Sequence, residues 1–70
     1  MAYTVVLERG PTSWGAYVPD LPGCVAAGES REAVVALIKE AIEFHLEGMK
    51  EGGELIPEPS SETVYVEVST

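Results

Sequence analysis

Cys24 and His45 are the side chains with the most reactive chemistry in this 70-residue chain. A cysteine nucleophile needs a base that generates the thiolate, and His45 is the one histidine in the sequence. A lone cysteine in a short apolar run usually packs as a small hydrophobic residue, and a histidine near an apolar helix stripe packs or lies at its rim. The sequence therefore favours structural roles for both residues.

Carboxylates offer a second chemistry, because the chain has 12 Asp and Glu residues against 4 Lys and Arg, a net charge of −8. Metal-assisted hydrolysis needs several carboxylates that converge on one point. In the early region, up to the end of the third predicted strand, only Glu8 and Asp20 are candidates for such a set. We therefore expect no catalytic residue, no metal site and no cofactor, and thus no enzyme.

Glutamates recur along the predicted helix at Glu40, Glu43, Glu47 and Glu51. A solvated helix face is the simplest interpretation of this pattern. However, Glu47 and Glu51 repel each other at the i,i+4 spacing. A basic protein partner would relieve that repulsion, so we predict that Glu40, Glu43 and Glu47 bind a partner.

Trp14 and Tyr17 could stack on the bases of a single-stranded nucleic acid. Such sites surround their aromatic residues with basic side chains, and only Arg9 lies nearby in the sequence. The chain also lacks a glycine-rich phosphate loop, and its acidity disfavours phosphate binding. We expect no direct nucleic-acid partner and assign the aromatic residues to packing or to a protein interface.

The elements that position these residues follow from the hydrophobic pattern. Runs rich in β-branched and aromatic residues predict strands, and turn clusters separate them. The predicted strands are residues 3–9, 14–18, 24–27 and 62–68. Val64, Val66 and Val68 alternate with polar or aromatic neighbours, as in a half-buried strand.

The remaining long segment is a predicted amphipathic helix that begins after Ser30 and ends near Glu51. Ser30 is a good N-cap, and Gly52-Gly53 supplies a left-handed C-terminal stop. Apolar residues recur on one side at helical spacing. They are Val34, Leu37, Ile38, Ala41, Ile42, His45 and Met49.

The order β-β-β-α-β predicts an α+β domain over residues 1–70. Three consecutive strands form an antiparallel meander, and the helix crosses one sheet face to deliver a fourth strand. The single helix leaves the other face open. If the registers hold, that face carries Tyr17 and Tyr65, which we predict to bind a partner.

The second turn, with Pro19, Asp20, Pro22 and Gly23, is expected to be structural. The two prolines end strand pairing and set the backbone for tight turns, and Gly23 can adopt a positive φ.

The ends and the cysteine count bear on location. The N-terminus lacks the features of a signal peptide, no apolar run is long enough for a membrane span, and one unpaired cysteine fits a reducing compartment. We expect a cytoplasmic protein without membrane contact. A core this small also favours a homo-oligomer.

Four runs of this sequence together resemble the HicB-like antitoxin family. They are Tyr17-Val18-Pro19-Asp20-Leu21-Pro22-Gly23-Cys24, Gly28-Glu29-Ser30-Arg31-Glu32-Ala33, Glu40-Ala41-Ile42 and Gly53-Glu54-Leu55-Ile56-Pro57-Glu58-Pro59. Each run alone would be only a turn, a cap or a loop, but their combination is specific and spans nearly the whole chain.

The resemblance implies a degraded ribonuclease H fold without its catalytic carboxylates, self-association, and direct binding of a HicA toxin, a small basic ribonuclease that cleaves mRNA. Many family members carry a C-terminal DNA-binding segment, and we expect this domain to act without one. The expected function is that of a non-catalytic antitoxin of a type II toxin–antitoxin system. The alternative is a binding module of the same fold that has no toxin partner.

Overall fold

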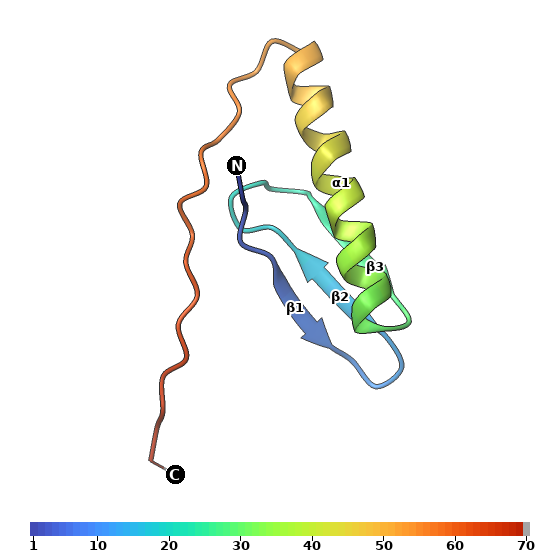
Figure 1. The fold of residues 1–70 in the computed structure, drawn as a ribbon, viewed down its shortest axis with the longest axis vertical. Helices are drawn as coiled ribbons and strands as arrows, with labels where there is room; N and C mark the ends of the chain where they lie inside the picture. The colour runs from blue at the N-terminus through green and yellow to red at the C-terminus, as the bar shows by residue number, and fades with distance from the viewer. Residues whose placement is uncertain (70) are drawn as a thin grey trace.

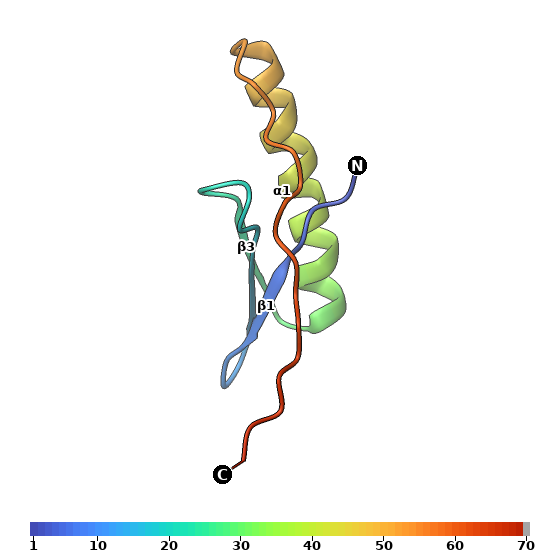
Figure 2. The same cartoon turned by 90° about the vertical axis from the view of Figure 1, so that its left-hand side faces the viewer.

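A computed structural model describes residues 1–69 as a three-stranded antiparallel sheet followed by one helix. The strands are β1 (Val6–Arg9), β2 (Trp14–Tyr17) and β3 (Val25–Gly28), and the helix is α1 (Arg31–Glu51). The strands follow each other in the order β1-β2-β3, and α1 covers one face of the sheet (Figures 1 and 2). The predicted α+β meander with one helix on one face is confirmed.

The first hairpin has the predicted four-residue loop. Arg9 pairs with Trp14 across its base, and the Gly10 amide donates to the Ser13 carbonyl at 2.8 Å. Each strand has four residues. Strands β1 and β2 are therefore shorter than predicted, and β3 has the predicted length but is shifted by one residue. Strand β3 begins one residue late because the Cys24 amide is already bonded to the Leu21 carbonyl within the preceding turn.

Local capping sets both ends of α1. At the N-terminus the Ser30 hydroxyl accepts a hydrogen bond from the Ala33 amide at 3.1 Å. At the C-terminus Gly53 has a φ of +72°, its amide donates to the Lys50 carbonyl, and the Glu54 amide donates to the Met49 carbonyl. This pair of bonds is a Schellman motif, so the predicted helix bounds are confirmed.

The core lies between α1 and the two strands beneath it. Its buried residues come from β2, from the turn after it and from the first half of α1; they are Ala16, Val18, Leu21, Cys24, Val34 and Ile38. A Cβ on Gly28 would lie 3.0 Å from the Val34 amide nitrogen, so this glycine allows β3 and α1 to approach closely. The helix packs on β2 and β3 but does not reach β1.

The prediction of a fourth strand at residues 62–68 is wrong. Residues 62–68 are extended, yet among residues 1–69 no strand includes them (Figure 1). They are tethered at Ser61 and then run past β1 in the same direction, and no backbone hydrogen bond joins the two segments within residues 1–69. Alternation predicted an extended segment correctly, but alternation specifies faces rather than a pairing partner.

In the described part of the chain, residues 1–69, no helix has both the length and the apolar character that crossing a membrane requires.

Candidate partner-binding surfaces

Two tight turns connect β2 to β3 and place Leu21 in the core. The Leu21 amide donates to the Val18 carbonyl at 3.0 Å, and the Cys24 amide donates to the Leu21 carbonyl at 3.0 Å. Pro22 and Gly23 are the central residues of the second turn, and Gly23 has a φ of +85°. These are the features of a type II turn, which needs a positive φ at its third residue.

Replacing Gly23 by Ala should destabilise the protein by about 1 kcal/mol, because an L-residue resists this backbone conformation. A Cβ at Gly23 would meet no atom within 4 Å, so the cost is conformational rather than steric. Gly48→Ala is the matched control, since it adds the same methyl in open space inside α1 and should stabilise by up to about 1 kcal/mol. Urea unfolding of both variants measures the difference, and equal effects would contradict the strained-turn argument.

The first of these turns also fastens the C-terminal part of the chain. Each oxygen of the Asp20 carboxylate accepts two hydrogen bonds. Oδ2 accepts from the amides of Ser60 and Ser61, both at 3.0 Å, and Oδ1 accepts from their hydroxyls at 3.1 and 2.8 Å. These bonds, led by the Ser61 amide and then the Ser60 amide, lower the pKa of Asp20 from 3.8 to about 2. We call this arrangement the Asp20 clamp.

Two more bonds hold the same stretch against the chain that leads into β1. The Tyr3 hydroxyl donates to the Pro57 carbonyl, and the Thr4 hydroxyl donates to the Ser61 carbonyl at 2.6 Å. Sequence reasoning gave Asp20 a role in the turn only. Its serine partners lie 40 and 41 residues away, and no local signal links an aspartate to residues so distant.

The residues with catalytic potential are not arranged for catalysis. Cys24 is buried, and this burial raises the pKa of its thiol, which disfavours the reactive thiolate. Both carboxylate oxygens of Asp20 already accept hydrogen bonds in the clamp, and Glu8 lies exposed on β1. Among residues 1–69 no three acidic, His or Cys side chains are grouped closely enough to hold a metal ion.

The outward face of α1 joins acidic and aromatic side chains. Phe44 is 82% exposed, an unusual position for an aromatic residue. Glu40, Glu47 and Glu51 are exposed on the same side at helical spacing. We call these four residues the acidic helix surface. Its aromatic member was missed by sequence reasoning, although its position between Glu40 and Glu47 was a readable signal.

Hollows flank Phe44 because the next turn of the helix carries Gly48, which has no side chain. One, of about 500 Å³, extends to Pro22 and Glu54, and a smaller one, of about 150 Å³, reaches Glu47. An exposed ring beside open hollows and carboxylates can insert between side chains of a partner while the acids meet basic groups.

The five residues predicted to bind a partner do not converge on one site. Glu40 and Glu47 belong to the acidic helix surface, while Glu43 lies farther round α1. Tyr17 is 40% exposed on the sheet face away from the helix, where it pairs with Val6 and Val25. Tyr65 is fully exposed on the extended C-terminal part of the chain.

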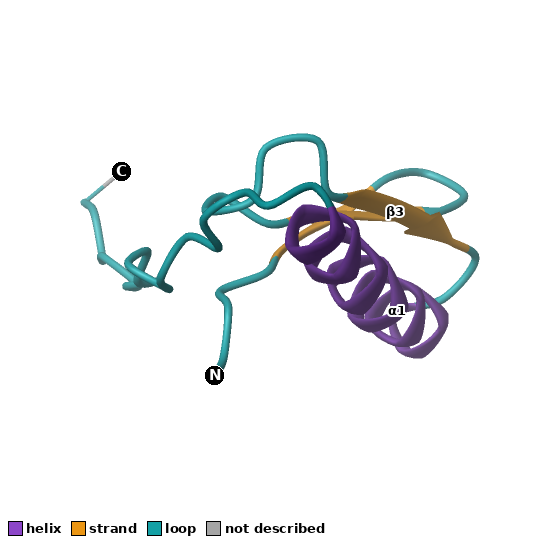
Figure 3. Cartoon of the chain, turned by 90° about the horizontal axis from the view of Figure 1, so that it is seen from above, coloured by secondary structure: helices purple, strands orange, loops and turns teal. Residues whose placement is uncertain are grey.

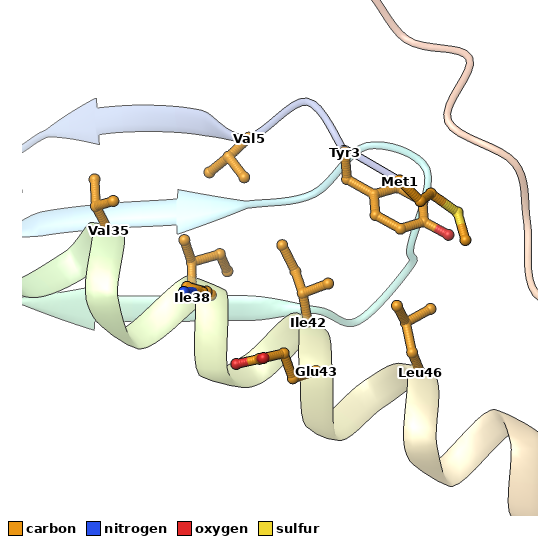
Figure 4. A pocket seen from close by; sticks show the side chains of 9 residues that line it. Met1, Tyr3, Val5, Val35, Ile38, Ile42, Glu43 and Leu46 are labelled. Atoms are coloured by element: carbon orange, nitrogen blue, oxygen red, sulfur yellow. The ribbon is translucent and has the colours of Figure 1, made fainter.

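Glu43 instead borders an apolar groove of about 360 Å³ between α1 and the chain leading into β1 (Figure 4). The groove exists because α1 leaves the β1 side of the sheet uncovered. Apolar side chains from both walls point into it; they are Tyr3, Val5, Val35, Ile38, Ile42 and Leu46. Val35 is consequently 42% exposed although it belongs to the inward half of the helix.

Comparison with known proteins gives these surfaces a family context. Residues 3–68 match the model of the HicB-like antitoxin of bacterial toxin–antitoxin systems. The chain is 36% identical over 66 residues to an uncharacterised 14.9 kDa protein of Haemophilus phage HP1, covering 94% of this chain and 50% of the phage protein. It is 34% identical over 67 residues to a UPF0150 protein of Thermoplasma acidophilum, covering 94% of this chain and 97% of the relative.

A relative with a functional name is Antitoxin HicB 2 of Photorhabdus laumondii, which is 33% identical over 73 residues; the match covers 97% of this chain and 50% of the relative. The chain therefore spans half of the phage protein and half of the Photorhabdus antitoxin but nearly all of the Thermoplasma protein. Since the family model covers almost every residue of the sheet, the helix and the segment after it, the chain belongs to the HicB-like antitoxin family.

Proposed function

We propose that this protein is a non-catalytic antitoxin that acts in the cytoplasm by binding a small, basic, HicA-like toxin that cleaves mRNA. Its family is described as antitoxins of bacterial toxin–antitoxin systems, and the named Photorhabdus relative is an antitoxin. The observation that carries the proposal is the acidic helix surface, where Phe44 is 82% exposed among carboxylates. A partner that binds RNA is basic, so its RNA-binding side complements this surface.

The acidic helix surface carries two kinds of side chain, which are expected to contribute differently to binding. An exposed aromatic residue that inserts into a partner supplies much of the binding free energy at many interfaces. Carboxylates around it mainly speed encounter and set specificity, and salt screens their contribution. Phe44 is therefore the proposed anchor, and Glu40 and Glu47 are the proposed steering residues. A toxin covered on its RNA-binding side would be unable to reach mRNA.

The test is to express any small basic protein encoded beside this chain's gene and to measure its binding by calorimetry at two salt concentrations. Phe44→Ala should weaken binding by a factor of about 30 or more, as for a central anchor. Glu40→Gln with Glu47→Gln should weaken binding several-fold and flatten its salt dependence. Glu58→Gln, which removes an exposed carboxylate outside the helix, is the control and should bind normally.

Two outcomes would count against the proposal in different ways. No binding of the adjacent basic protein at low micromolar concentration would contradict the antitoxin function itself. Normal binding by every helix variant would move the interface to another surface, and Tyr17→Ala and Tyr65→Ala would then test the open sheet face and the C-terminal part of the chain.

A further inference from the structure

The larger of the two hollows beside Phe44 is a cleft with two walls. The second half of α1 extends beyond the ends of the strands, so the strands do not lie against it (Figures 1 and 2). Seen from above, α1 lies on one side of the sheet (Figure 3), and the turn between β2 and β3 supplies the opposite wall through Pro22. We call this hollow of about 500 Å³ the Phe44 cleft. Its lining residues are Pro22, Phe44, His45, Gly48, Met49 and Glu54.

Gly48 keeps the Phe44 cleft open. A Cβ at this position would meet no atom within 4 Å, so close packing does not require a glycine. Its φ is not positive either, although glycine costs roughly 1 kcal/mol relative to alanine inside a helix. A larger side chain at position 48 would project beside Phe44, which lies one turn earlier on the same face. Neither packing nor backbone conformation requires this glycine, whereas an open cleft does.

The lining of the cleft combines an aromatic ring, an apolar floor and a carboxylate. The Phe44 ring is 82% exposed, so its face is accessible to a cation. Pro22 and Met49 supply apolar surface. The Oε2 atom of Glu54 lies 3.6 Å from the place that a Cβ on Gly52 would take, beside the C-terminal end of α1. That end of a helix carries partial negative charge, so the carboxylate and the helix both favour a cation here.

We propose that the Phe44 cleft binds one arginine side chain of the protein partner. The guanidinium would stack on Phe44 and donate to the carboxylate of Glu54, while the aliphatic stem of the arginine lies against Met49 and Pro22. The inference rests on the proposed function in one respect, because the basic toxin is the protein expected to supply the arginine.

Other side chains fit the cleft less well than arginine does. A lysine ammonium is compact and strongly hydrated, so it cannot stack on a ring and donate two parallel hydrogen bonds at once. An apolar side chain would exclude water from the Glu54 carboxylate without giving it a partner, which is costly. A cleft that offers both a ring and a carboxylate therefore selects a guanidinium.

The cleft can be tested without a toxin, by NMR titration with short acetylated and amidated peptides. Three peptides carry arginine, lysine or uncharged citrulline between two glycines. One side chain binds weakly, so we expect a dissociation constant of about 1 mM for the arginine peptide, with amide shifts centred on Gly48 and Glu54. The lysine peptide should bind about threefold more weakly or worse, and the citrulline peptide about tenfold more weakly.

Two substitutions separate the cleft from the general acidity of the chain. Gly48→Gln fills the cleft and Glu54→Gln removes its carboxylate, and each should weaken binding of the arginine peptide about fivefold or more. Gly48→Gln should also raise the melting temperature, because it removes a glycine from the helix, so lost binding would not reflect unfolding. Glu58→Gln is the matched control, since Glu58 is an exposed carboxylate outside the cleft; this variant should bind the arginine peptide normally.

Equal binding of the three peptides, or unchanged binding of the arginine peptide by Gly48→Gln, would overturn the proposal. So would a toxin that binds Gly48→Gln and Glu54→Gln as tightly as the unchanged chain, although the antitoxin function would then stand. If no adjacent basic protein binds but the arginine peptide binds selectively, the antitoxin function fails and the arginine cleft stands.

Discussion

Leu21→Ala is expected to lower the free energy of unfolding by about 3 kcal/mol, which is within the range measured when a buried leucine is replaced by alanine. Leu21 is 0% exposed and lies at the centre of the core cluster with Val34 and Ile38. A domain of this size has little stability in reserve, so the variant should be largely unfolded near body temperature. Urea unfolding followed by circular dichroism, at one fixed protein concentration, measures the loss.

The control for this experiment is Leu55→Ala. Leu55 is 94% exposed, and truncating it should change stability by less than about 0.5 kcal/mol. If Leu21→Ala cost as little as Leu55→Ala, the turn between β2 and β3 would not belong to the core. The comparison isolates burial, because both variants remove the same atoms.

Asp20→Ala is expected to release the C-terminal part of the chain while leaving the sheet and helix folded. The substitution removes an acceptor of four hydrogen bonds to Ser60 and Ser61. Among residues 1–69, the side-chain hydrogen bonds that then still hold this stretch come from Tyr3 and Thr4. Amide hydrogen exchange should show lost protection at Ser60 and Ser61 and unchanged protection in α1. Unchanged protection at both serines would contradict the clamp.

The clamp also predicts a response to acid. The pKa of Asp20 is about 2 in the folded protein and 3.8 without its partners, so folding favours the ionised form. The contribution of the clamp is therefore complete above about pH 5 and is lost as the pH falls through about 2. Amide shifts of Ser60 and Ser61 should titrate in that window. Asp20→Asn should abolish this transition, and Glu62→Gln, a nearby exposed carboxylate, should leave it intact.

Local signals determined most of the fold. Turn residues and β-branched runs predicted the meander, and Ser30 with Gly52 and Gly53 predicted both ends of α1, because caps and tight turns depend on a few neighbouring residues. The family resemblance rested on the same local runs. Strand bounds were less well predicted, because hydrogen bonds from neighbouring turns competed for the terminal residues.

The partner-binding residues were only partly placed by periodicity. Helical spacing put Glu40 and Glu47 together, but Glu43 proved to border the apolar groove, since α1 covers only β2 and β3. Phe44 was overlooked although helical spacing places it between them. The position of a helix across a sheet depends on close approaches such as that of Gly28 to Val34. The spacing of apolar residues along the sequence does not specify such approaches.

What the sequence determined by itself was a sheet of three antiparallel strands, a capped amphipathic helix, an extended stretch after it and membership of the HicB-like antitoxin family. What only the tertiary structure decided was where this stretch lies. Its alternation specifies two faces, but its pairing depends on which backbone edge lies within hydrogen-bond reach. The Asp20 clamp, formed between residues 40 positions apart, holds it beside β1 without pairing.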